Sequence, residues 1–274
     1  MTADALRADL DLALLLADRA DEVTMAGFRR ADLHVETKPD LTPVSEADQT
    51  AEQLIRAGVA EARPGDAVLG EEHGTTGTGS RRWIVDPIDG TKSYVRGLPA
   101  WATLIAVEVD GTQTVGVVSA PALGRRWWAA RGMGAFAAEP GTPDSEATPI
   151  RVSAVRALSD AQLSGSTLCN WEPHGGVGRV LALAMRCWRD RAFGDFWSHV
   201  LVAEGACDIG LDPIASLWDL AALQVIVEEA GGRFTDLSGA DRVDGGSAVS
   251  TNGLLHAEVL GLLTGTGGLS PAGP

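Results

Sequence analysis

Apolar residues recur along this chain with two different periods, which predicts a mixture of helices and strands. From residue 3 to about residue 31, leucines and alanines return at helical spacing between aspartates and arginines, which predicts one long amphipathic helix. A second helix is predicted to begin near Ser45 and to end before Pro64-Gly65. Ser45 and Asp48 have the spacing of a capping box, so an ordinary role is available to Asp48 at the start of that helix.

Shorter apolar runs in the first half predict strands, and turn residues separate them. Asp110-Gly111 indicates a hairpin between two of these runs. The segment 38–43, with two prolines, is predicted to be an irregular loop, and the Gly- and Thr-rich segment 75–80 a flexible one. Strands are expected at 67–70, 82–85, 101–109 and 115–119, and a hairpin or strand pair at 127–138.

The second half alternates strands with helices. Polar residues and three prolines fill 139–149, which predicts a boundary there between an N-terminal α+β domain, 1–149, and a C-terminal α/β domain, 150–263. The Gly- and Pro-rich segment 264–274 is expected to be disordered. Blocks of strands and helices predict an α/β or α+β protein with layered sheets. Strands are expected at 150–152, 161–165, 207–211 and 233–235, and helices at 178–189, 197–204, 216–230 and 254–263.

The charge of the chain constrains its partners. Lys and Arg number 22 against 37 Asp and Glu, which gives a net charge of −15 over 274 residues. Such an acidic protein is expected to bind neither nucleic acid nor an anionic membrane surface. It would also repel a phosphate ester, unless bound divalent cations offset the negative charge locally.

Cysteine usage favours a reducing compartment. Cys169, Cys187 and Cys207 are widely spaced and form no Cys-x-x-Cys pair, so reduced thiols in a cytoplasmic protein are predicted rather than a disulfide framework. Charged residues are interspersed among the N-terminal leucines, so no signal peptide is expected. The apolar run 12–17 is too short to span a membrane.

The stretch Trp83-Ile84-Val85-Asp86-Pro87-Ile88-Asp89-Gly90-Thr91 predicts a buried strand that runs into a tight turn. Pro87 has no N–H to donate and ends the strand ladder, and Gly90 permits backbone angles that other residues resist. Asp86 and Asp89 therefore leave the strand end together. Two neighbouring carboxylates repel each other unless a cation lies between them, and hard oxygen ligands suit Mg²⁺. The alternative is an Asx-turn with both aspartates solvated.

Two more acidic residues stand at the ends of predicted elements. Glu71 follows a strand, and Asp219 lies in the first turn of the helix 216–230. Asp219 alone could be a partner of the helix dipole. These residues could act with Asp86 and Asp89 only if the fold brings them together, and the sequence alone leaves that open.

Three motifs, in order, resemble those of the inositol monophosphatase superfamily, which contains Mg²⁺-dependent, Li⁺-sensitive phosphatases. They are Gly70-Glu71-Glu72, the stretch 83–91 and Trp218-Asp219-Leu220-Ala221-Ala222, with Gly231-Gly232 following at the usual distance. The resemblance runs from the first helix to about His256. One departure is Ser93-Tyr94, where the family more often has Asn-Phe. The resemblance implies an α/β/α/β/α sandwich, a small phosphorylated substrate and a homodimer.

The resemblance also implies a set of metal ligands. Glu71, Asp86 and the carbonyl of Ile88 match the ligands of a first metal. Asp86, Asp89 and Asp219 match those of a second metal. A third, weaker metal again uses Glu71, so two or three Mg²⁺ per subunit are implied.

Catalytic roles follow from the same positions. Thr91 and Glu71 would orient and deprotonate the attacking water. The N–H groups of Gly90 and Thr91 would hold phosphate oxygens, as turns that lead into helix N-termini do. Lys38 and Asp48 match outer positions of the family site, with Asp48 counted among the catalytic residues.

A closer resemblance narrows the substrate class. Four further stretches resemble the histidinol-phosphate phosphatases that actinobacteria have within this superfamily. Their substrate carries an ammonium and an imidazole beside its phosphate, and Asp195 and Asp212, together with Asp219, would favour that cation. Loop solvation or a turn cap is the alternative role for Asp195 and Asp212. The four stretches are 41–44, 124–132, 194–196 and 201–205.

Two other functions stay open from the sequence. The same chemistry could act on inositol monophosphate or on another small sugar or nucleotide phosphate. A catalytically silent member that serves as an interaction partner is the other alternative. The intact set of acidic residues and hydroxyl argues against a silent member, since a binding module has no need of all of them. That set is Glu71, Asp86, Asp89, Thr91 and Asp219.

Overall fold

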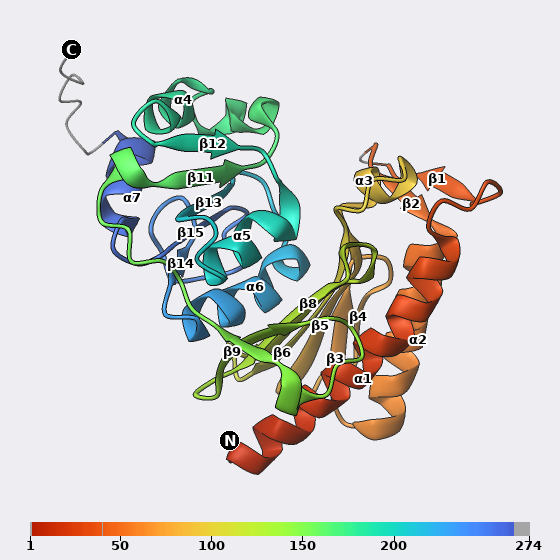
Figure 1. Cartoon of the computed structure of the whole chain (residues 1–274). Coiled ribbons are helices and arrows are strands. Elements are labelled where there is room, and N and C mark those ends of the chain that lie inside the picture. The colour runs from red at the N-terminus through yellow and green to blue at the C-terminus, as the bar shows by residue number, and fades with distance from the viewer. Residues whose placement is uncertain (1, 40, 266–274) are drawn as a thin grey trace. The chain divides into compact units, whose positions relative to one another are not determined.

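The computed structural model describes residues 2–39 and 41–265 (Figure 1). Most of the segment predicted to be disordered, 264–274, therefore lies outside the described residues. The chain divides into two compact units. One consists of the residues up to Pro149 together with Ala221–Ile226, and the other of Ile150–Leu220 and the residues from Val227 onward. Each unit has its own sheet and its own apolar core.

The first unit is built on an eight-stranded sheet with the order β10-β9-β8-β7-β6-β5-β3-β4. Strands β3 and β5 are parallel, with Gly70 opposite Val85, so both strands leave the sheet at the same edge. The predicted hairpin at Asp110-Gly111 joins β6 to β7. The strands are β3 (Ala67–Gly70), β4 (Gly74–Thr76), β5 (Arg81–Asp89), β6 (Ala102–Val109), β7 (Thr112–Ala120), β8 (Arg125–Ala130), β9 (Gly134–Ala138) and β10 (Thr148–Ile150).

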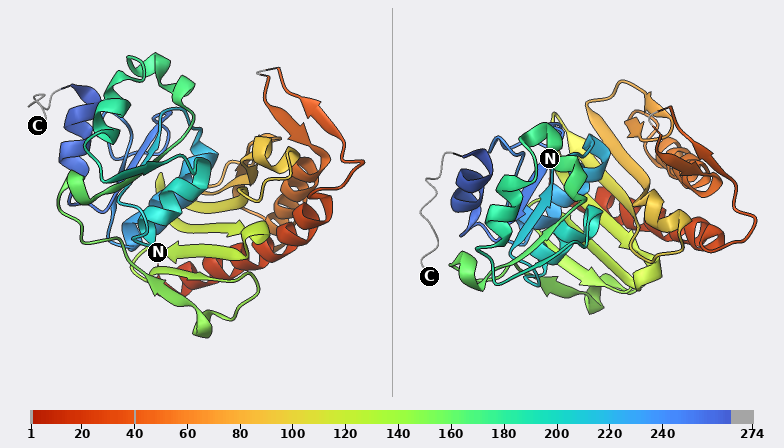
Figure 2. Two further views of the ribbon diagram at one scale, coloured as in Figure 1. Left: turned by 45° about the horizontal axis from the view of Figure 1, so that its top comes forward. Right: turned by 90° about the horizontal axis from the view of Figure 1, so that it is seen from above.

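Two helices, α1 (Ala3–Gly27) and α2 (Glu46–Ala62), lie side by side over one face of this sheet (Figures 1 and 2). The amphipathic pattern explains this, because their apolar stripes meet the sheet in one core that includes Leu16, Ile55 and Trp83. The predicted capping box of α2 is confirmed. Ahead of α2, β1 (Val35–Thr37) pairs with β2 (Pro43–Ser45), so Pro43, the last residue of the loop predicted at 38–43, belongs to a strand.

The opposite face of the sheet carries the middle of α6 (Leu217–Glu229). Val115 and Val117 of β7 belong to the core under α1 and α2, so Gly116 between them faces the other way. A Cβ atom on Gly116 would lie 2.3 Å from the carbonyl oxygen of Ala222. Only glycine allows the backbone of α6 to approach the strand this closely.

The second unit is built on a five-stranded sheet with the order β12-β11-β13-β15-β14. On β13, Ile209 and Leu211 share a core with α4 (Gly178–Ala184) and α7 (His256–Thr264). Gly210 between them faces α5 (Asp195–Ala203), so helices cover both faces. The predicted layered α/β fold is confirmed. The strands are β11 (Gln162–Gly165), β12 (Arg189–Arg191), β13 (Ile209–Asp212), β14 (Arg233–Thr235) and β15 (Ala248–Thr251).

Several elements of the structure differ from the expectation. The segment predicted as a flexible loop from residue 75 contributes to β4, which pairs with β3. Strand β15 was not predicted, because its small residues Ala-Val-Ser-Thr give a weak apolar signal although all four are buried. Helix α4 ends at Ala184, five residues before its predicted end. None of the helices in the described ranges has both the length and the hydropathy that a transmembrane span needs.

Candidate active site

The site begins where two parallel strands end. Because Gly70 pairs with Val85, the next residues along each strand, Glu71 and Asp86, emerge side by side, and the N–H of Glu71 donates to the carbonyl of Val85 at 3.2 Å. Beyond Asp86 the pairing of β5 with β6 shifts register before Asp89, as expected of a strand interrupted by proline. Asp86 Oδ1 accepts a hydrogen bond from the N–H of Ile88 at 3.0 Å, so the Asx-turn and the convergence of carboxylates occur together.

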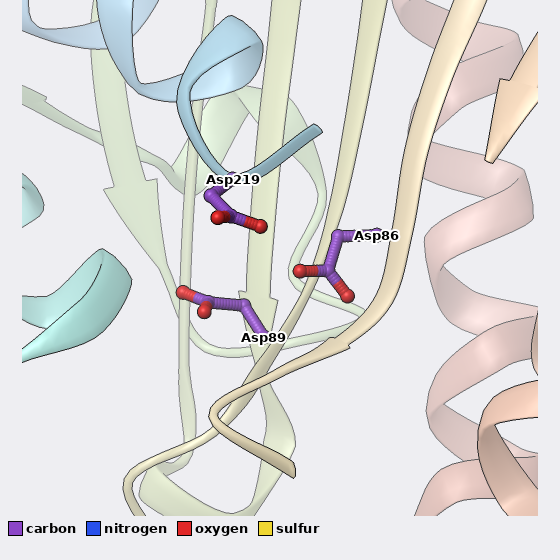
Figure 3. Close-up of side chains that lie close together, drawn as sticks. All are labelled: Asp86, Asp89 and Asp219. Atoms are coloured by element: carbon purple, nitrogen blue, oxygen red, sulfur yellow. The ribbon is translucent and has the colours of Figure 1, made fainter. Parts of the chain in front are cut away.

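Three carboxylates meet at this strand end. Oxygen atoms of Asp86, Asp89 and Asp219 all lie within 4.8 Å of one another (Figure 3). Asp219 stands in the first turn of α6, where its Oδ2 also accepts the N–H of Ser216 at 2.7 Å. Carboxylates gathered this closely repel one another, and an ion with hard oxygen ligands at about 2.0–2.1 Å would relieve that repulsion. The donor set therefore fits Mg²⁺.

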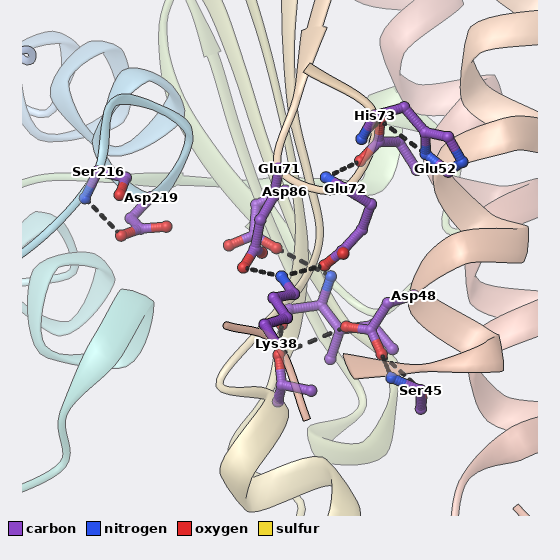
Figure 4. A network of polar contacts seen from close by, with 12 residues as sticks. Lys38, Ser45, Asp48, Glu52, Glu71, Glu72, His73, Asp86, Ser216 and Asp219 are labelled. Carbon is purple, nitrogen blue, oxygen red and sulfur yellow. Dashed lines mark hydrogen bonds and ion pairs between the residues drawn. The ribbon is translucent and has the colours of Figure 1, made fainter. Parts of the chain in front are cut away.

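Glu71 stands beside this group in contact with a lysine. Lys38 Nζ lies 2.7 Å from Glu71 Oε1 and 2.6 Å from Glu72 Oε1 (Figure 4). Burial favours the neutral amine of Lys38, but the hydrogen bonds and charges of the two glutamates outweigh it and raise the pKa of Lys38. Burial raises the pKa of Glu72 to about 7, against the opposing effect of Lys38. Lys38 thus carries a permanent positive charge between two carboxylates.

Asp48 links helix α2 to the same site. Its Oδ2 accepts the N–H of Ser45 at 2.8 Å and the hydroxyl of Ser45 at 2.6 Å, while Oδ1 lies 3.4 Å from Thr91 Oγ1. Thr91 Oγ1 also lies 3.0 Å from the carbonyl oxygen of Ile88, to which it can donate. Burial raises the pKa of Asp48 to about 6, although the hydrogen bonds from Ser45 oppose the shift. Asp48 therefore has two contacts: it completes the capping box with Ser45, and its other carboxylate oxygen lies next to the Thr91 hydroxyl.

The turn after Asp89 leads directly into a short helix. Gly90 has φ 85° and ψ 34°, the left-handed conformation that glycine adopts without strain, and it precedes the short helix α3 (Thr91–Val95). An aromatic cluster anchors that helix, since Tyr94 packs edge-on against Trp101 with ring centroids 4.9 Å apart. The hydroxyl of Tyr94 donates to the carbonyl of Thr24 at 2.7 Å. The tyrosine thus ties α3 to α1.

A second group of carboxylates lies in the second unit. Asp212 ends β13 and is 8% exposed, and Asp195 begins α5 with φ 47°, an uncommon angle for a residue other than glycine. Burial, followed by the negative charges of Asp195 and Asp219, raises the pKa of Asp212 to about 7. The backbone N–H of Ile214 opposes the shift. Asp195, Asp212 and Asp219 are thus close enough to interact.

The motifs and the geometry agree with a comparison of the whole chain. A sequence model of the inositol monophosphatase family matches residues 6–264. The chain belongs to the inositol monophosphatase family. Proteins of this family in general depend on Mg²⁺ and act on small phosphorylated substrates.

Two histidinol-phosphatases and one solved structure are similar to this chain over almost its whole length. A histidinol-phosphatase of Mycobacterium tuberculosis is 58% identical, with 92% of this chain and 96% of the relative covered. A histidinol-phosphatase of Streptomyces coelicolor is 54% identical, with 93% of this chain and 96% of the relative covered. Among solved structures, the Thermotoga maritima IMPase superposes with a TM-score of 0.82 at 30% identity, with 94% of this chain and 97% of that chain covered.

The structure brings together only part of the site predicted from the family resemblance. Asp86, Asp89 and Asp219 form one group, whereas the carboxylate of Glu71 is engaged by Lys38. Sequence reasoning did not single out Glu52, a fully buried carboxylate on α2. Its position four residues after Asp48 was the available signal, because residues at that spacing share one helix face.

Proposed function

We propose that this protein is a Mg²⁺-dependent phosphomonoesterase that hydrolyses L-histidinol phosphate to L-histidinol and phosphate. The observation that carries the proposal is the convergence of the Asp86, Asp89 and Asp219 carboxylates at the end of a buried strand. The names of the relatives at 58% and 54% identity support the choice of substrate.

The metal ligands we assign are those that the family resemblance implies. Glu71, Asp86 and the carbonyl oxygen of Ile88 would hold one ion. Asp86, Asp89 and Asp219 would hold a second ion, and a third would again use Glu71, for two or three Mg²⁺ per subunit. Bound Mg²⁺ supplies Lewis acidity, lowers the pKa of water and stabilises charge on the phosphate and leaving oxygen.

The chain's own groups handle the water and its proton. Glu71 and the hydroxyl of Thr91 would hold the attacking water, and Thr91 can pass a proton toward Asp48 Oδ1, 3.4 Å away. A carboxylate with a pKa of about 6 is a competent proton acceptor near neutral pH. The N–H groups of Gly90 and Thr91 would hold the phosphate oxygens, and Lys38 would keep Glu71 in place.

Substrate choice would come from the other end of the molecule. The metal ions and backbone N–H groups recognise phosphate, which all candidate substrates share, so discrimination must lie elsewhere. Asp195 and Asp212, together with Asp219, supply negative charge beside the leaving alcohol, where histidinol phosphate carries its cationic groups. The pKa of Asp212 is raised to about 7, and a nearby ammonium would lower it and stabilise the charged form of Asp212.

Two attributes of the protein extend the proposal. Three free cysteines support a reducing cytoplasmic location. Exposed apolar side chains lie on α4, at its two ends and just after it, and support a homodimer that would cover them. They are Val177, Leu181, Met185 and Trp188.

Inositol monophosphate is the second candidate substrate, favoured by the similarity to the Thermotoga maritima IMPase. A phosphate-release assay with Mg²⁺ over L-histidinol phosphate, inositol monophosphate and fructose bisphosphate separates the candidates. We expect the highest kcat/KM for L-histidinol phosphate. A higher value for inositol monophosphate would overturn the substrate assignment and leave the phosphatase assignment intact.

A further inference from the structure

A fully buried carboxylate, that of Glu52, accepts hydrogen bonds from the turn that carries Glu71. Glu52 lies on α2 with no exposed surface. Its Oε2 accepts the N–H of Glu72 at 2.7 Å, and its Oε1 accepts the N–H of His73 at 3.1 Å (Figure 4). Both N–H groups belong to the turn that follows β3, so the side chain satisfies donors that the sheet leaves unpaired.

Arg56, one turn further along α2, contacts both Glu52 and the same turn. Its Nε donates to Glu52 Oε1 at 2.7 Å, which neutralises the buried carboxylate. Its terminal nitrogens donate to the carbonyl of Gly74 and to Thr76 Oγ1, the latter at 3.0 Å. Helix α2 therefore holds both ends of the segment from Glu72 to Thr76.

Gly70 leaves room for the carboxylate. A Cβ atom on Gly70 would lie 2.2 Å from Glu52 Oε1 and 2.3 Å from its carboxyl carbon. The glycine is not required for a left-handed backbone, because its φ lies outside that range. The requirement for glycine in Gly70-Glu71-Glu72 is therefore steric, and the buried Glu52 imposes it.

We propose that Glu52 is a positioning residue for the metal site. By fixing the N–H groups of Glu72 and His73, it fixes the direction in which the Glu71 side chain leaves the strand end beside Asp86. This inference rests on the proposed function in one respect, the role of Glu71 as a metal ligand. Groups that orient metal ligands in this way typically change metal affinity about 10–100-fold when they are mutated.

The variant E52Q tests the proposal with little change of volume. A glutamine offers one acceptor oxygen and one NH₂ group, so whichever way it turns, one of the two N–H groups faces a donor. The matched control is D9N. Asp9 is also fully buried and also pairs with arginines, Arg63 at 3.0 Å and Arg81 at 3.3 Å. Arg81 begins β5, five residues or about 16 Å along the strand from Asp86.

The measurement is a calorimetric titration of each metal-free protein with Mg²⁺, which needs no turnover. We expect E52Q to raise the Kd for Mg²⁺ by about tenfold or more, and D9N to leave it unchanged. Hydrogen exchange should be faster at the amides of Glu72 and His73 in E52Q alone. A wild-type Kd in folded E52Q, or an equal rise in D9N, would overturn the positioning role.

A second variant covers the case in which E52Q does not fold. G70A keeps the charge of Glu52 but forces its carboxylate away from the turn, and it should weaken Mg²⁺ binding in the same direction. A wild-type Kd in G70A would then refute the proposal. Phosphate release by the wild-type protein is a separate readout. Its absence would refute the proposed function, whereas the Mg²⁺ titrations would still decide the role of Glu52.

Discussion

Gly116 and Ala222 lie in van der Waals contact through their backbones, although more than a hundred residues separate them in the sequence. A Cβ atom on Gly116 would lie 2.3 Å from the carbonyl oxygen of Ala222. Ala222 is one turn after Asp219 on the same helix, so the close approach of α6 to β7 holds the helical turn that follows Asp219. The missing side chain of Gly116 thus allows the close approach of the helix that carries Asp219.

The variant G116A should disturb both stability and metal binding. Its methyl group has no room beside Ala222, and overpacking of this kind typically lowers the free energy of unfolding by about 1–3 kcal/mol. We also expect weaker Mg²⁺ binding, because α6 must move. Urea unfolding and Mg²⁺ titration would measure the two effects. The control is G65A, since a Cβ atom on Gly65 meets nothing within 4 Å. Unchanged Mg²⁺ binding in G116A would show that the close approach of α6 to β7 does not position Asp219.

The variants D219N and D86N should lose most phosphatase activity while remaining folded. Each removes one negative charge from a group of carboxylates that repel one another, so the metal-free variants should unfold at the same or a slightly higher temperature than wild type. In D219N the amide oxygen can still accept the N–H of Ser216. Initial rates at limiting Mg²⁺ and thermal melts provide the readouts. Wild-type turnover of D219N at limiting Mg²⁺ would remove Asp219 from the ligand set.

The sequence was informative where chemistry is local and silent where it depends on long-range packing. Asp86 and Asp89 could be identified because Pro87 interrupts the strand ladder between them and Gly90 follows directly after the strand. The capping box at Ser45 is equally local and could be predicted. The pairing of Lys38 with Glu71 could not, because it joins a loop to a strand end 33 residues away.

Burial of charge was the other limit of sequence reasoning. Apart from its spacing of four residues from Asp48, Glu52 looks like any polar residue of an amphipathic helix, and the packed turn shows that its face points inward. Strand β15 escaped prediction for the converse reason, since serine and threonine fill positions that are fully buried. In both cases the tertiary environment overrides the local hydrophobic pattern.

Asp212 should make the metal-free protein less stable as the pH rises from about 4 to about 7. Its pKa is raised from 3.8 to about 7, so in this window the native state holds a proton that the unfolded state has released. Stability therefore falls with pH until Asp212 has ionised. Urea unfolding across the window should give a flatter profile for D212N than for wild type. The exposed-site control D160N should retain the wild-type slope, and an identical slope in D212N would contradict the burial argument.

Asp212 should also determine substrate preference. A partly buried charge-assisted hydrogen bond contributes about 1.5–3 kcal/mol, and about 1.4 kcal/mol corresponds to a tenfold change. We therefore expect D212N to lower kcat/KM for L-histidinol phosphate by about ten- to a hundredfold. Hydrolysis of glycerol phosphate, whose alcohol carries no charge, should barely change. Equal losses on both esters would mean that Asp212 supports the metal site or the fold instead.

The most direct test of the proposed function is the initial rate of phosphate release from L-histidinol phosphate by the wild-type protein, measured with Mg²⁺ and again with excess chelator. The convergence of Asp86, Asp89 and Asp219 predicts turnover with Mg²⁺, almost none with chelator, and recovery when Mg²⁺ is restored. Full turnover in the presence of excess chelator, or no release from any phosphate ester at saturating Mg²⁺, would contradict the assignment.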